Sequence, residues 1–86
     1  MLRVHKSALK HGCTIEDISH AADMAMYSDI LDEDHDPPKQ LIIGPDSAAN
    51  ILELIGGELN GDLLIWHADR CRKSYLTLLP RTGGDT

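Results

Sequence analysis

The sequence predicts a small α+β domain, in which one or two N-terminal helices pack on a three-stranded antiparallel sheet and a short helix or turn follows at the C-terminal end. Three observations lead to this fold class. The chain has 86 residues, which suits one domain. Helical patterns occupy the N-terminal part, three strand-like segments joined by turn signals follow them, and a last helix or turn is permitted after the strands. We expect the domain to span residues 1–79 and residues 80–86 to form a disordered tail.

The two expected helices are separated by a helix-start signal. Residues 3–11 are expected to form a short helix, because Val4, Ala8 and a histidine recur at helical spacing. A second helix is expected over residues 15–27, where the apolar residues form one face. Thr14 is a suitable N-cap for it, and Asp17 stands at the position where an acid completes a capping box.

The second half of the chain carries the strand signals. Residues 28–40 concentrate acids and prolines, which disfavour helix and strand, so a solvated loop is predicted there. Strands are expected over residues 41–44, 50–57 and 62–68. Asn60-Gly61 is a strong hairpin turn between the last two, and residues 69–79 permit a final helix or turn.

The charge of the chain is strongly segregated. The net charge of −6 argues against a protein that coats nucleic acid. Residues 1–11, however, carry three cations and no acid, residues 12–38 carry eight acids and no Lys or Arg, and residues 66–86 are basic again. If the fold joins the two basic ends, a basic patch forms despite the acidic total. The alternative is that these charged faces are simply solvated.

Several classes of protein and site are excluded. No apolar run approaches the roughly 20 residues of a membrane-spanning helix, and the basic N-terminus lacks the apolar stretch of a signal peptide. We therefore expect a cytoplasmic protein without a membrane partner. Cys13 and Cys71 form no CxxC pair; one disulfide between them stays open, and two reduced thiols are the simpler interpretation. His11 and His67 add zinc donors, but no pair has ligand spacing, so we expect no metal and no cofactor.

Three segments together resemble one known family. They are Lys6-Ser-Ala-Leu-Lys-His-Gly-Cys-Thr-Ile-Glu-Asp-Ile-Ser-His-Ala, Leu41-Ile-Ile-Gly-Pro-Asp and Leu64-Ile-Trp-His-Ala-Asp-Arg-Cys-Arg-Lys-Ser-Tyr-Leu. This arrangement resembles the BrnT-like toxins of bacterial type II toxin–antitoxin systems, within the broader RelE-like ribonuclease fold, over most of residues 6–76. The resemblance implies a metal-independent endoribonuclease, in which the RNA 2′-OH attacks the adjacent phosphate, and neutralisation by a cognate antitoxin.

Such a reaction needs a base for the 2′-OH, an acid for the leaving 5′-oxygen and a cation for the phosphate. His67 can act as acid or base. It is expected on a strand face with Leu63 and Ile65, so the alternative is a core or rim histidine. Tyr75 can donate a proton or stack on a base, and its alternative is a core residue. The catalytic candidates are His67, Arg70, Arg72 and Tyr75, and the RNA-binding candidates are Lys10, His11 and Lys73.

Three hypotheses about function follow. The first is the endoribonuclease toxin, which the basic ends favour. The second is a non-catalytic protein-interaction module of the same fold, which the acidic segment 12–38 favours because it repels phosphate. The third is a structural or interaction protein unrelated to toxins. The sequence leaves open the RNA target, the identity of the antitoxin and whether the chain forms a homo-oligomer.

Overall fold

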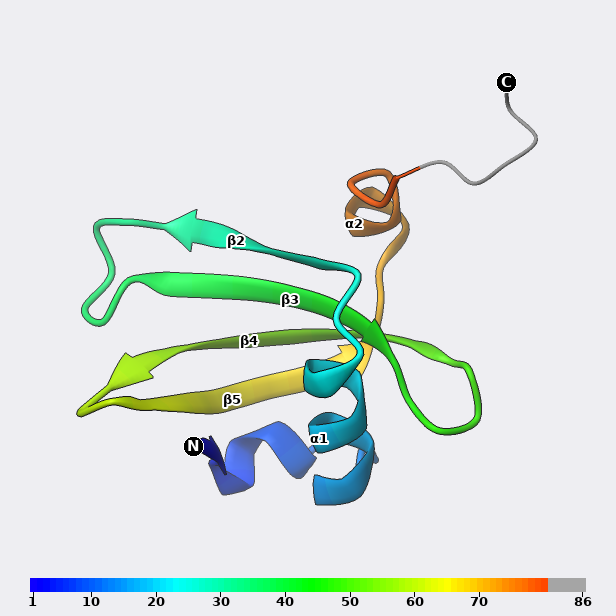
Figure 1. The fold of residues 1–86 in the computed structure, drawn as a ribbon, viewed down its shortest axis with the longest axis horizontal. Helices are drawn as coiled ribbons and strands as arrows, with labels where there is room; N and C mark the ends of the chain where they lie inside the picture. Colours follow the sequence, from blue (N-terminus) through cyan, green and yellow to red (C-terminus); the bar gives the residue numbers. More distant parts are fainter. Residues whose placement is uncertain (81–86) are drawn as a thin grey trace.

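A five-stranded mixed sheet dominates the protein (Figure 1). The computed structural model describes residues 1–80, so residues 81–86 of the expected tail lie outside the described residues. The strands lie in the order β1-β5-β4-β3-β2, and all neighbours are antiparallel except β1 and β5, which are parallel. The strands are β1 (Leu2–Val4), β2 (Tyr27–Asp32), β3 (Lys39–Pro45), β4 (Ile51–Leu59) and β5 (Asp62–Arg70). The helical segments are the 3₁₀ helix η1 (Lys6–Leu9), α1 (Ile15–Asp23) and α2 (Lys73–Leu76).

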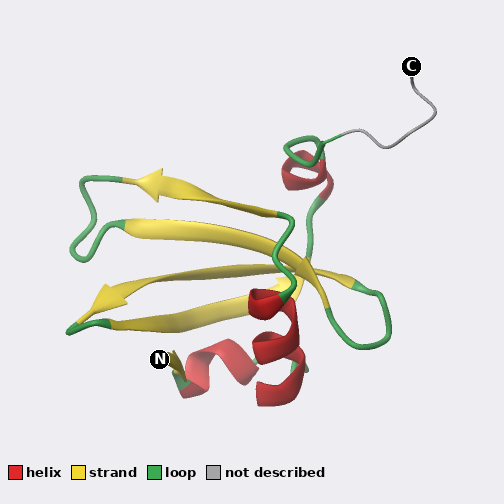
Figure 2. Ribbon diagram, in the orientation of Figure 1, coloured by secondary structure: helices red, strands yellow, loops and turns green. Residues whose placement is uncertain are grey.

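The predicted three-stranded antiparallel sheet under N-terminal helices is wrong. Figure 2 shows how much of the described chain belongs to the sheet. In place of a helix over residues 3–11, Leu2–Val4 forms β1 and one short 3₁₀ helix follows. The reason is a non-local one: Leu2 lies beside Leu63 of β5, and the amide of His5 donates to the carbonyl of Ile65 at 2.8 Å. Such a parallel partner leaves no trace in the local pattern of residues.

The segment predicted as a loop over residues 28–40 is also different. Its first part is the outer strand β2, which pairs antiparallel with β3. The preceding helix stops at Asp23, not at residue 27, and the amide of Met26 already donates to the carbonyl of Ile43 at 2.7 Å. Acidic side chains are tolerated in β2 because an outer strand exposes them to water.

The helix start and the hairpin turn are confirmed. The Thr14 hydroxyl accepts from the Asp17 amide at 3.0 Å, and the Asp17 carboxylate accepts from the Thr14 amide at 2.9 Å, which is a complete capping box. Asn60 and Gly61 have φ of 55° and 86°, as a tight hairpin turn between β4 and β5 requires.

The core lies between α1 and one face of the sheet, which we call the helix face. Buried Ile18 and Ala21 of α1 pack there against β3 and β4, and Ala8 of η1 joins the same core beside β5. Gly44 of β3 permits the close approach, because a Cβ at this position would overlap the main-chain carbonyl of Ala21. We call the other side of the sheet the open face because α1 does not cover it. It carries the side chain of Glu53, which pairs across the sheet with Ile43, and both side chains are buried.

A bulge in β5 decides which face His67 occupies. Ile55 of β4 pairs with His67, but its neighbour Gly56 pairs with Ile65, so Trp66 is an extra residue without a partner. Because paired residues share a face, His67 lies on the open face with Ile55, while Ile65 enters the core. The expectation that His67 shares a face with Ile65 is therefore wrong: strict alternation fails at the bulge.

Candidate functional site

A buried carboxylate organises the open face of the sheet. Glu53 of β4 is 2% exposed and accepts four hydrogen bonds. Its Oε2 accepts from His67 Nε2 at 2.8 Å and from Arg72 Nη2 at 2.7 Å. Its Oε1 accepts from Arg72 Nε at 3.0 Å and from the Arg72 main-chain amide at 2.9 Å. The Glu53 carboxylate therefore holds both the histidine and the arginine, and it also binds the main chain just after β5.

The electrostatics of this cluster keep the Glu53 carboxylate ionised at neutral pH. Burial alone would raise the pKa of the Glu53 carboxyl, but the hydrogen bonds from Arg72 and His67 outweigh it and lower the pKa to about 2. The side-chain hydrogen bond with Glu53 raises the pKa of the Arg72 guanidinium in turn. Glu53 and Arg72 thus form a bidentate ion pair with one partner inside the fold and the other half-exposed.

The Arg72 guanidinium also contacts an aromatic ring. Its carbon lies 4.5 Å from the centroid of the Tyr75 ring, which is within range of a cation–π interaction. Tyr75 belongs to the one-turn helix α2 and is partly buried. The contact joins α2 to the sheet through Arg72, because this arginine is bound to Glu53 on its other edge.

A second histidine meets His67 at the side of the sheet next to η1. The ring centroids of His11 and His67 are 5.6 Å apart in an edge-to-face arrangement. His11 Nδ1 lies 3.7 Å from a carboxylate oxygen of Asp69, and both side chains are about two-fifths exposed. His67 is one-quarter exposed. The two imidazoles, each beside its own carboxylate, therefore form a small solvent-accessible group of proton donors and acceptors.

The structure brings together some of the predicted site residues and separates others. Glu53 links His67 to Arg72, and His11 and Tyr75 extend this chain of contacts at its two ends. Arg70 pairs with Leu52, whose side chain enters the core, so Arg70 points to the helix face instead.

Two predicted lysines are neighbours of site residues in the sequence, but they make no contact with the cluster that we describe. Lys10 directly precedes His11, Lys73 directly follows Arg72, and both lysines are exposed. Together with Arg70, they make no ion pair with any residue in the described range 1–80. Their positive charge remains available to an anionic partner.

Sequence reasoning missed Glu53 and Asp69 as site residues. A signal for Glu53 is present: it is an acid flanked on both sides by aliphatic residues within a strand, in the run Ile51-Leu-Glu-Leu-Ile. A charge in such a segment is seldom buried unless it is paired, so it points to a cation elsewhere in the chain. Nothing local marks Asp69, because its role depends on how η1 brings His11 to β5.

Two further features lie outside this cluster. His35, in the loop between β2 and β3, stacks on Trp66 with ring centroids 5.5 Å apart. A pocket of about 220 Å³ lies at the other end of β5 and is lined by Arg3, His5, Leu59, Asn60, Asp62 and Leu64. The histidine pair is therefore a surface site and not the wall of this pocket.

The cysteines and the metal question have separate outcomes. Cys13 and Cys71 are free thiols and half-buried, and burial is the main reason why the pKa of each thiol is raised. Within residues 1–80, no group of three or more His, Cys, Asp or Glu side chains is arranged to hold a metal ion. Among the same residues, no helix is long and apolar enough to cross a membrane.

Comparison with known proteins gives no family for this chain. No protein-family model matches it, and neither does any curated protein or solved structure. The function therefore has to be argued from the residues and their geometry.

Proposed function

We propose that the protein is the toxin component of a bacterial type II toxin–antitoxin system and a metal-independent endoribonuclease of the cytoplasm, with a cognate antitoxin as its partner. The observation that supports the proposal most is the pair of solvent-accessible imidazoles, His11 and His67, 5.6 Å apart and each beside a carboxylate. RNA cleavage by the 2′-OH needs one proton acceptor and one proton donor at the same phosphate, and two histidines supply both.

The chemistry assigns roles to the two histidines, to Glu53 and to the neighbouring cations. One imidazole removes the proton from the 2′-OH, whose oxygen forms a bond to phosphorus. The other imidazole protonates the 5′-oxygen as its bond to phosphorus breaks, which leaves a 2′,3′-cyclic phosphate and a 5′-hydroxyl. Glu53 holds His67 by Nε2, so that Nδ1 remains for the RNA. Lys10 and Lys73 attract the phosphate backbone of the RNA. Arg72 adds positive charge through Nη1, the guanidinium nitrogen that Glu53 does not bind.

The test is expression of the chain alone in bacteria, with growth and bulk mRNA as readouts. The proposal predicts growth arrest and loss of mRNA, and both should disappear in His11→Ala and in His67→Ala. His35→Ala is the matched control, because this exposed histidine stacks on Trp66 outside the cluster and its loss should leave the arrest unchanged. Purified protein should also cleave single-stranded RNA in the presence of a chelator and leave cyclic phosphate ends.

Normal growth at high soluble expression would overturn the proposal, and so would RNA cleavage that survives both histidine substitutions. Failure would favour the second candidate, a non-catalytic protein-interaction module of the same fold. A specific observation supports that candidate: the Arg72 guanidinium, which a phosphate would need, is already bound to buried Glu53. For this second candidate, we expect bacteria that express the protein to grow normally and the protein to show no salt-dependent RNA binding.

A further inference from the structure

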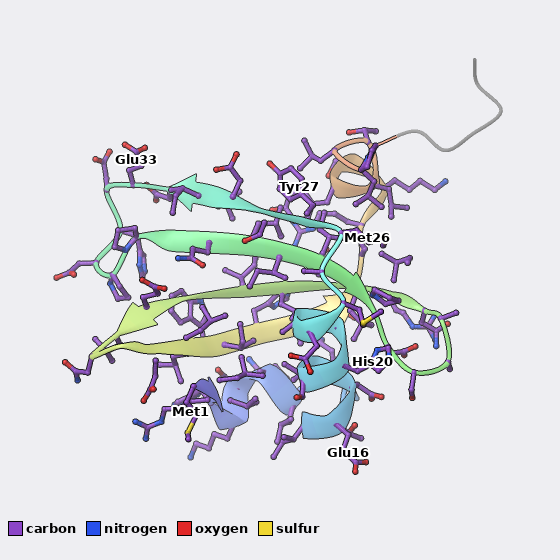
Figure 3. All side chains as sticks on the ribbon, viewed as in Figure 1. Met1, Glu16, His20, Met26, Tyr27 and Glu33 are labelled. Carbon is purple, nitrogen blue, oxygen red and sulfur yellow. The ribbon has the colours of Figure 1, made fainter. Side chains whose placement is uncertain are left out.

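The outer edge of β2 is an exposed stretch of backbone without a strand partner among the described residues. In the described part of the chain, β2 has a neighbour on one side only, namely β3. Five of its six residues are exposed. Figure 3 labels Tyr27, the first residue of β2, and Glu33, which lies in the loop just after the strand. The other outer strand, β1, has three residues. An exposed strand edge is a template for a further strand, and β2 is the longer of the two edges.

The hydrogen bonds show which groups of β2 face outward. The Ile30 amide donates to Oδ1 of Asp29 at 2.8 Å, so this amide is not part of the ladder with β3. Backbone groups alternate along a strand, so the amides and carbonyls of Ser28 and Ile30 point away from β3, whereas those of Tyr27 and Asp29 point toward it. A bulge at Leu31 ends the regular stretch.

The side chains of this edge combine exposed aliphatic surface with negative charge. Ile30 and Leu31 are 42% and 41% exposed, so both present aliphatic surface to solvent at this edge. Asp29 and Asp32 belong to the strand, and three further acids follow in the loop. No Lys or Arg occurs anywhere in residues 12–38. The segment itself therefore supplies no cation. Lys39 of β3 pairs with Asp32 in the ladder, but it makes no ion pair within the described residues, so the edge stays acidic.

This charge decides between two occupants. A second copy of the chain would bring the same acids to the same edge, and like charges on neighbouring strands are destabilising. A basic strand would be attracted instead. We propose that the β2 edge binds an extended segment of a partner protein in which Lys or Arg alternates with aliphatic residues, and that this segment adds a sixth strand to the sheet. The partner's carbonyl takes the Ile30 amide, which frees Asp29 to pair with a basic side chain.

This inference rests on β2 alone and not on the proposed ribonuclease, so either can fail without the other. The probe is a synthetic octapeptide of alternating Lys and Val. Its controls are the corresponding Glu–Val peptide and a Lys–Val peptide that is N-methylated at alternate residues and cannot complete the ladder. We expect the Lys–Val peptide to bind, with amide shifts and slowed hydrogen exchange at Ser28 and Ile30, and we expect neither control peptide to bind.

Two substitutions at one position separate backbone pairing from side-chain contact. Ile30→Pro removes an amide that β3 does not use, and proline is tolerated where the amide of an outer strand faces water. We expect it to weaken peptide binding by about tenfold or more. The matched control, Ile30→Val, keeps the amide and should leave binding within about twofold.

A third variant covers the case in which proline perturbs the fold. Asp29→Asn combined with Asp32→Asn keeps the backbone and should weaken binding and flatten its salt dependence. The inference is overturned if the Lys–Val peptide does not bind at millimolar concentration. It is also overturned if the shifts map away from β2, or if binding is unaffected by both Ile30→Pro in a folded protein and the double Asn variant.

Discussion

The ion pair between Glu53 and Arg72 gives the sharpest test of the structure. Arg72→Met removes both side-chain hydrogen bonds from the guanidinium and leaves a carboxylate that is 2% exposed with His67 and one main-chain amide. A drop in the pKa of Glu53 from 4.5 to about 2 corresponds to roughly 3 kcal/mol. Because the Arg72 side chain is 52% exposed, we expect a smaller loss, about 2 kcal/mol at neutral pH.

The loss should depend on pH with a definite sign. The folded pKa of Glu53 lies below its unfolded value, so the carboxylate stabilises the native protein above the unfolded pKa of 4.5, and this contribution disappears as the pH falls toward about 2. Without Arg72, the Glu53 carboxyl is protonated at higher pH, so the variant loses less of its stability when the pH falls. The gap in unfolding free energy between the two proteins should narrow by about 1 kcal/mol between pH 7 and pH 4.

Urea denaturation followed by circular dichroism measures both quantities. Arg70→Met is the matched control, because Arg70 is exposed and makes no ion pair with the described residues; we expect a change within about 0.5 kcal/mol at either pH. The reasoning is refuted if Arg72→Met costs no more than Arg70→Met. A gap that stays constant from neutral to acid pH would refute the role assigned to Glu53.

Three further outcomes are expected. Gly44→Ala should lower the free energy of unfolding by about 2 kcal/mol or more, because the new Cβ overlaps the Ala21 carbonyl; an unchanged melting temperature would contradict the packing of α1 on β3. Gly61→Ala should cost about 1 kcal/mol in the same measurement, since φ is +86° and the space around the glycine is open, so that only backbone strain acts. Cys13 and Cys71 should react with iodoacetamide more slowly than a free thiol at neutral pH, because burial raises their pKa; fast labelling in the folded protein would show that these thiols are not half-buried.

Local signals predicted those elements whose cause is local. The sequence predicts the Thr14–Asp17 capping box because both partners lie within one helical turn. Asn60-Gly61 was readable because few residue pairs accept positive φ twice. The strands of the β3–β4–β5 meander were found with bounds within a few residues, since their aliphatic residues stand between clear turn signals.

The errors have causes that lie far along the chain. β1 exists because β5 offers a parallel partner, and β2 exists because β3 holds one side of an acidic segment that would not form a strand by itself. The bulge at Trp66 moved His67 to the open face, where the chain could bring it to Glu53. These pairings join distant segments, so they leave no periodic pattern of residues within any one segment.

The sequence by itself determined the segregated charge, one helix start, one hairpin and the residue types from which a proton-transfer site can be built. The tertiary structure alone decided which of these residues meet. It placed His11 against His67, gave the Arg72 guanidinium to Glu53 and turned Arg70 to the helix face. The physical reason is that strand pairing and register are set by hydrogen bonds between distant segments, and a shift of one residue moves a side chain from one face of a sheet to the other.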